Sequence, residues 1–228
     1  MRSKTLGFLS LYLLLSTILF LVLFTIDMAG ASQMDLFEQV LDRVAKQSIL
    51  SRLAYANVTL LTIVTTMLMA GLYVFTKRLA PVWATIGLVF TPVYCVLNLF
   101  AYFSQITIVP RLLELRQLPQ YQTAAEFLLR QLIQTWPASA VSIFNNTAYG
   151  ILGIPSIIFG VLLYRIHPTF RVGAVLLAIN GVMCITGVIG FVLNNQILMW
   201  GSMAGAVFYL LALIPLSLAF LRKDPAHV

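Results

Sequence analysis

The sequence predicts an all-α membrane protein, a polytopic bundle of six transmembrane helices with two amphipathic helices in its outer loops. Of the 228 residues, 61% are hydrophobic and 9% are charged, and the mean hydropathy is +0.96. A soluble domain carries about 25% charged residues. Several apolar runs also exceed the roughly 18 residues that cross a bilayer as a helix. The short alternating segments of a membrane β-barrel do not occur.

The six spans are expected at about 5–27, 53–75, 82–106, 142–164, 172–193 and 198–221, each end to within ~2–4 residues. All should be helical, because lipid offers the backbone no hydrogen-bond partner. Together they predict one transmembrane domain over residues 1–228.

Particular residues bear on whether the first span is retained and on where the third span ends. The first follows Arg2 and Lys4 and could be a signal peptide, but its apolar run is longer than the roughly 7–15 residues of a signal core. We therefore expect a retained span. The third should end near Pro110, which lacks an amide hydrogen and disfavours helix at Val109.

Two outer loops are expected to form amphipathic helices at about 33–50 and 122–136. The first begins with "SQMD", a capping-box pattern, and places Phe37, Val40 and Leu41 on one face. The second repeats apolar residues at helical spacing from Ala125 to Trp136. Such helices lie on the membrane surface or pack on the protein, and both interpretations stay open.

The distribution of charge predicts the topology. With the N-terminus inside, the inner ends of the spans hold eight basic residues and one acid, whereas the outer side holds six of each. Cytoplasmic loops carry the excess of Lys and Arg, so both termini should lie in the cytoplasm. The net charge of +7 then reflects topology, and the expected partner is the lipid bilayer rather than a nucleic acid.

Cofactor and metal sites are not expected. Cys95 and Cys184 fall inside spans without a CxxC motif, and His167 and His227 lie outside the spans. No ionisable residue is predicted deep in the membrane, which disfavours catalysis and ion-driven transport, and no catalytic residue is assigned. Asp27, at the outer edge, is the acid to test for catalysis, although it could simply be the charge that ends a span.

A polar stripe runs along the third span. Thr91, Tyr94, Asn98, Tyr102 and Gln105 are spaced 3, 4, 4 and 3 residues apart, which places them on one helix face. The fourth span has a matching segment, "SIFNNTAYG", in the same outer half. The candidate ligand-binding residues are Tyr94, Asn98, Tyr102, Gln105, Asn145, Asn146 and Tyr149.

Two interpretations of this stripe are open. It could line an outer-leaflet cavity that binds a neutral or amphipathic ligand of lipid, quinone or isoprenoid type. It could instead join helices by hydrogen bonds, the commoner role of such residues. The second interpretation suits a structural or accessory subunit of a membrane complex, and a facilitator of a neutral solute is a further alternative. Gly201 and Gly205 form a GxxxG pattern that marks either a homodimer face or packing within one chain.

The stretch "YFSQITIVPRLLE", followed some 30 residues later by "SIFNNTAYGILGIPSIIFG", resembles a pattern in uncharacterised small bacterial membrane proteins with about six spans. In that pattern a polar or acidic pair precedes Gly-Tyr or Tyr-Gly, and here Asn145 and Asn146 precede Tyr149 and Gly150. The resemblance covers about half of the chain and implies a protein of the bacterial inner membrane, without an activity. The missing acid puts a proton-linked role in doubt.

Overall fold

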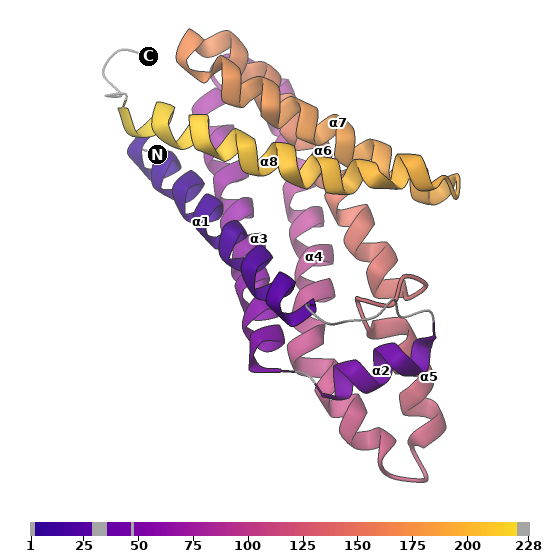
Figure 1. Cartoon of the computed structure of the whole chain (residues 1–228). Coiled ribbons are helices and arrows are strands. Elements are labelled where there is room, and N and C mark those ends of the chain that lie inside the picture. Colours follow the sequence, from indigo (N-terminus) through magenta and orange to yellow (C-terminus); the bar gives the residue numbers. More distant parts are fainter. Residues whose placement is uncertain (1–2, 29–35, 47, 223–228) are drawn as a thin grey trace. The chain divides into compact units, whose positions relative to one another are not determined.

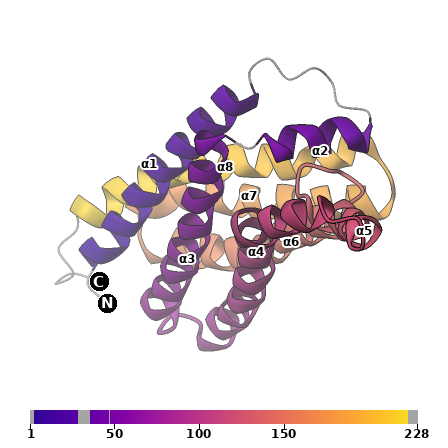
Figure 2. The same ribbon diagram turned by 90° about the horizontal axis from the view of Figure 1, so that it is seen from below.

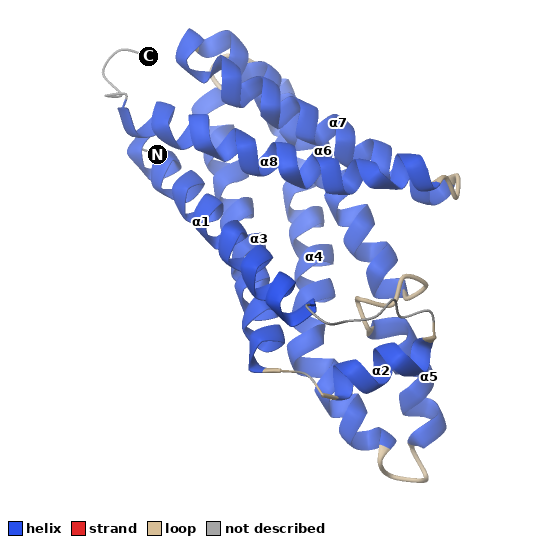
Figure 3. Ribbon diagram, in the orientation of Figure 1, coloured by secondary structure: helices blue, strands red, loops and turns tan. Residues whose placement is uncertain are grey.

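The computed structural model describes residues 3–28, 36–46 and 48–222, and this part of the chain is helical, without strands (Figure 3). Its elements are α1 (Ser3–Met28), α2 (Phe37–Ala45), α3 (Ile49–Thr76), α4 (Pro81–Arg116), α5 (Gln122–Leu132), α6 (Ala140–Ile166), the 3₁₀ turn η1 (Pro168–Phe170), α7 (Arg171–Val192) and α8 (Gln196–Arg222). Six segments, one in each of α1, α3, α4, α6, η1 with α7, and α8, are long and apolar enough to cross a membrane. The predicted all-α class with six spans and two amphipathic helices is confirmed.

The predicted end of the third span is wrong. Helix α4 continues through Pro110 to Arg116, ten residues beyond the expected end at residue 106. Val109 and Leu112, on the continued segment, are buried in an apolar cluster with residues of α2 and α5. The buried members are Phe37, Val40, Leu41, Val109, Leu112, Leu129 and Ile133. Burial of this face offsets the backbone hydrogen bond that Pro110 cannot donate.

The two amphipathic helices are shorter than predicted, but their apolar faces are largely as expected. Helix α2 begins at Phe37 and buries Phe37, Val40 and Leu41, whereas the predicted capping box at 32–35 lies outside the described residues. Helix α5 ends at Leu132, where Ile133 adopts an extended backbone, four residues before the predicted end at residue 136. Both helices pack on the end of α4, which favours packing on the protein for their apolar faces.

The chain forms two compact units. The first unit contains residues 1–15, 62–96 and 146–228, and the second contains residues 16–61 and 97–145. Helices α7 and α8 belong to the first unit, and α2 and α5 belong to the second. Helices α1, α3, α4 and α6 each contribute a segment to both units. The single domain expected from the sequence stays a prediction.

Close helix contact dominates the first unit. Helices α7 and α8 run side by side, as Figures 1 and 2 both show. A Cβ atom placed on Gly201 would lie 2.7 Å from the backbone nitrogen of Gly187, and one on Gly153 would lie 2.6 Å from the carbonyl oxygen of Gly181. Only a hydrogen atom fits at these crossings. The GxxxG pattern of Gly201 and Gly205 therefore packs within one chain, against α7.

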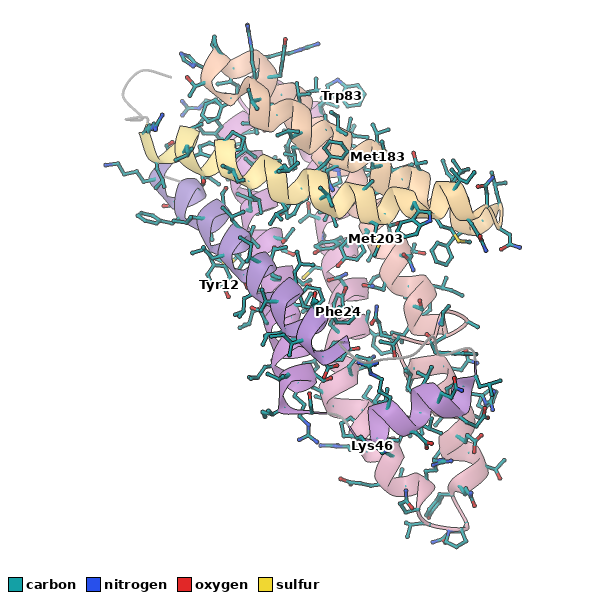
Figure 4. All side chains as sticks on the ribbon, in the orientation of Figure 1. Tyr12, Phe24, Lys46, Trp83, Met183 and Met203 are labelled. Carbon is teal, nitrogen blue, oxygen red and sulfur yellow. The ribbon has the colours of Figure 1, made fainter. Side chains whose placement is uncertain are left out.

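Large apolar side chains cover the outside of the spans. Tyr12, Trp83 and Met203, labelled in Figure 4, are 42%, 60% and 64% exposed. In water such a surface would aggregate, whereas in a bilayer it contacts acyl chains. The exposed surface thus agrees with the composition in describing a multi-pass membrane protein.

We expect Gly181→Leu to destabilise the first unit, because its side chain would overlap the backbone of Gly153 and the side chain of Ile157. Overpacking of this kind costs about 1–3 kcal/mol. Unfolding in mild detergent measures the loss, with Val182→Leu as the control, since the neighbouring Val182 is 52% exposed. Equal stability of the two variants would contradict the close helix contact.

Candidate functional site

Two side chains of the predicted stripe and one from the matching segment of the fourth span form a buried cluster in the second unit. The Nδ2 atom of Asn98 donates to Oδ1 of Asn145 over 3.0 Å. The Nδ2 atom of Asn145 donates to the Tyr102 hydroxyl over 3.3 Å. The three residues are 1%, 6% and 5% exposed. Asn98 and Tyr102 lie one turn apart on α4, as the spacing predicted, and Asn145 reaches them from α6.

Tyr55 of α3, which was not among the candidates predicted from the sequence, extends this cluster. Its ring centroid lies 6.3 Å from that of Tyr102, with the planes inclined at 39°. The Tyr55 side chain is half-buried, and its hydroxyl forms no hydrogen bond with the described residues. Tyr55 lies between charged Arg52 and polar Asn57 near the start of a span, where an aromatic ring indicates only the membrane interface, so nothing in the sequence marks it as a member of a cluster.

Gln105 performs a different task from the one the stripe suggested. Its Nε2 atom donates to the carbonyl oxygen of Leu132 over 2.9 Å, and its Oε1 atom accepts from the backbone amide of Gln134 over 3.1 Å. It also donates to Ala101 and Ser104 on its own helix. Gln105 therefore satisfies backbone groups at the end of α5, which an ending helix leaves open.

The other three candidates lie in the first unit. Tyr94 of α4 is buried, and its ring centroid lies 6.4 Å from that of Tyr149 of α6, at 49° between the planes. Asn146 and Tyr149 are half-buried. The seven predicted residues are thus divided: Asn98, Tyr102, Gln105 and Asn145 lie in the second unit, and Tyr94, Asn146 and Tyr149 in the first.

Asp27 forms a second polar centre, at the end of α1. Its Oδ1 atom accepts from the Ser48 hydroxyl over 2.7 Å, and its Oδ2 atom accepts from the Ser51 hydroxyl over 2.6 Å. Arg43 of α2 lies 3.6 Å from the carboxylate and also donates to the backbone carbonyl of Asp27. Ser48 additionally accepts from the amide of Ser51 over 3.1 Å, as a helix N-cap does.

This arrangement joins α1, α2 and α3 through one carboxylate. The Asp27 side chain is only 17% exposed, and both of its oxygens accept hydrogen bonds from serines. A carboxylate held in this way serves as a joint between helices rather than as a general base open to substrate. The acid itself could be selected from the sequence, but its partners could not, because Arg43 lies within α2 and Ser48 and Ser51 follow that helix.

The described residues contain no group of three or more His, Cys, Asp or Glu side chains that could hold a metal ion. Cys95 and Cys184 are free thiols, and Asn180 donates to the Cys184 sulfur over 3.4 Å. The chemistry present at the candidate sites is therefore hydrogen bonding by amides and hydroxyls, next to aromatic rings. Comparisons with protein families, with characterised proteins and with solved structures found no match.

We expect Asn98→Leu and Asn145→Leu each to destabilise the protein by about 1–2 kcal/mol, because each leaves a buried amide without its partner. The double variant should cost less than the sum, since it removes both halves of one hydrogen bond. Unfolding of all three variants in detergent measures the coupling. Phe103→Leu, at an exposed position of α4, is the control, and strictly additive losses would contradict the bond.

We expect Asp27→Asn to lower stability by about 1–3 kcal/mol, because the neutral amide loses the attraction of Arg43 and cannot accept at both oxygens. Glu38→Gln is the matched control. Glu38 pairs with Arg130 at 3.0 Å, but the side chains are 62% and 42% exposed, and such surface pairs contribute about 0–1 kcal/mol. Thermal unfolding compares the stability of the two variants. An equal loss of stability in both would contradict the role of Asp27 in joining the helices.

Proposed function

We propose that the second unit binds the polar group of a neutral, amphipathic molecule of lipid, quinone or isoprenoid type, at the depth of the outer leaflet. The observation that carries this proposal is the Tyr55 hydroxyl. It lies half-buried on an apolar span without a hydrogen bond to the described residues, and its ring contacts Tyr102 of the Asn98–Asn145–Tyr102 cluster.

The chemistry of the cluster selects the ligand class. A phenol hydroxyl donates one hydrogen bond and accepts others, so it can bind a carbonyl, ether or hydroxyl oxygen. A polar group left unpaired in apolar surroundings is costly, which favours an occupant that pairs with it. The neighbouring cluster consists of two amides and a second phenol, without a charge to balance an ionised ligand. Aromatic rings beside a few polar groups are typical lining for such ligands.

The nearest carboxylate does not change this selection. Ser51 lies one turn before Tyr55 on α3 and donates to Asp27. The Asp27 oxygens already accept from Ser48 and Ser51, and Arg43 balances the charge. The local charge is therefore neutralised next to the hydroxyl, in keeping with an uncharged ligand.

The placement in the outer leaflet follows from the charge distribution. With the excess of basic residues on the cytoplasmic side, as topology rules require, the end of α1 at Asp27 lies outside and both termini lie inside. The proposed location is the inner, or plasma, membrane of a bacterium, as the resemblance of the two quoted stretches implies.

A structural or accessory subunit of a membrane complex is the second candidate. It is favoured by the mutual hydrogen bonds of Asn98, Asn145 and Tyr102, and by the bonds of Gln105 to the end of α5. In this role the cluster only fixes α4 against α6, and the Tyr55 hydroxyl meets headgroups or water.

Native mass spectrometry of the protein from mild detergent, with identification of bound molecules, separates the two candidates. We expect a stoichiometric neutral amphipathic molecule on the unmodified protein and, because one hydrogen bond contributes about 1–2 kcal/mol, roughly tenfold lower occupancy in Tyr55→Phe. Tyr12→Phe is the control, since Tyr12 is an exposed tyrosine of α1. Finding each of the three proteins only at its own unliganded mass would reject the binding role and support the structural one.

A further inference from the structure

The described residues of the first unit carry a net positive charge. They include six cations and no acid, since Asp27, Glu38, Asp42, Glu114 and Glu126 belong to the second unit and Asp224 lies outside the described residues. The six cations are Lys4, Lys77, Arg78, Arg165, Arg171 and Arg222. All six side chains are exposed and lie at or next to a helix end. The ion pairs of the described chain, by contrast, lie in the second unit.

Three phenylalanines bring these helix ends together. The ring centroids of Phe170 and Phe220 are 4.8 Å apart, and Phe75 lies 5.3 Å from Phe220 and 5.7 Å from Phe170. Phe170 and Phe220 are 1% and 0% exposed, so this triad is a packed core. Each ring lies within two residues of a cation in the sequence, and the triad therefore gathers Lys77, Arg171 and Arg222 around one buried centre.

The start of α1 joins the same end of the unit. The Ser3 hydroxyl donates to the carbonyl oxygen of Phe220 over 3.0 Å, and Gly7 contacts Leu221 so closely that a Cβ atom would overlap it. Lys4 follows Ser3 directly, so it lies near the end of α8 that carries Arg222. Arg78 directly follows Lys77, and Arg165 lies at the end of α6, just before η1 with Phe170. We call the six cations the basic end.

Two cations of the basic end lie over tyrosine rings. The Lys77 ammonium is 5.6 Å from the ring centroid of Tyr73, and the Arg171 guanidinium is 5.2 Å from that of Tyr164. Tyrosine rings beside exposed cations are typical of the headgroup layer of a membrane. Guanidinium groups also bind phosphate in a two-pronged geometry that no other side chain offers.

We propose that the basic end binds the phosphate groups of anionic phospholipids. Gathering these six cations raises the electrostatic repulsion among them, and an anion at this end relieves it. The adjoining spans are apolar helices, so the anions that lie at the level of their ends are lipid headgroups. The site is separate from the one proposed in the second unit, and it assigns the basic end to the anionic leaflet.

Lipid titration followed by native mass spectrometry tests this site. The probes are phosphatidylglycerol and phosphatidylcholine with identical acyl chains, added to the protein in a neutral detergent. We expect roughly tenfold tighter binding of phosphatidylglycerol, because each basic residue near anionic lipid adds to the attraction. The variant K77Q/R171Q/R222Q should lose most of that preference, and K77R, which keeps the charge, should retain it.

The matched control is K46Q/R52Q/R111Q, which removes three exposed cations of the second unit. It should keep the preference for phosphatidylglycerol. Equal binding of the two lipids, or an equal loss in both glutamine triples, would overturn the proposal. A final titration adds excess inorganic phosphate to the protein with bound phosphatidylglycerol. Complete displacement of the lipid would show that the basic end binds free phosphate, and the lipid assignment would be wrong.

Discussion

A polar group inside a bilayer finds its hydrogen-bond partner within the protein or not at all, and the structure depends on this constraint. Asn57 of α3 meets it by bonding the hydroxyl and the backbone carbonyl of Ser16 on α1. Asn98 meets it across α4 and α6, and Asn180 donates from α7 to the carbonyl oxygen of Gly205 on α8. Each amide reaches a different helix, so the side chains that would be expensive in lipid become the contacts that fix helix pairs.

The two units meet the same constraint by different means. In the first unit, glycines let α6, α7 and α8 approach so closely that backbones touch, and Asn180 can reach Gly205 only because no side chain intervenes. In the second unit, polar side chains and two short helices close the structure: Gln105 satisfies the end of α5, and Asp27 joins α1 to α2 and α3. In the first unit, dispersion between closely packed helices stabilises the structure within lipid. The second unit instead buries an apolar cluster beneath short amphipathic helices, as the core of a soluble protein does.

This difference explains what the sequence could predict. The spans and the buried faces of α2 and α5 follow from hydropathy and periodicity, which are local properties. The end of α4 does not, because Pro110 favours a break locally while the burial of Val109 and Leu112 against other helices keeps the helix intact. The spacing of the stripe placed Asn98 beside Tyr102 correctly. It could not place Asn145 opposite them, nor give Gln105 its bonds near residues 132 and 134, because those partners depend on tertiary packing.

The packing of α2 and α5 on α4 shows which force holds the second unit. Arg130 pairs with Glu38 and Glu126, and Arg116 lies 3.9 Å from Glu126, but these pairs are partly or largely exposed and contribute about 0–1 kcal/mol each. Each of the seven buried apolar side chains beneath them contributes about 1.5–3 kcal/mol. Burial of these apolar side chains therefore supplies most of the stability, and the ion pairs contribute little. The ion pairs of the described chain all lie in the second unit, whereas the described residues of the first unit hold cations and no acid.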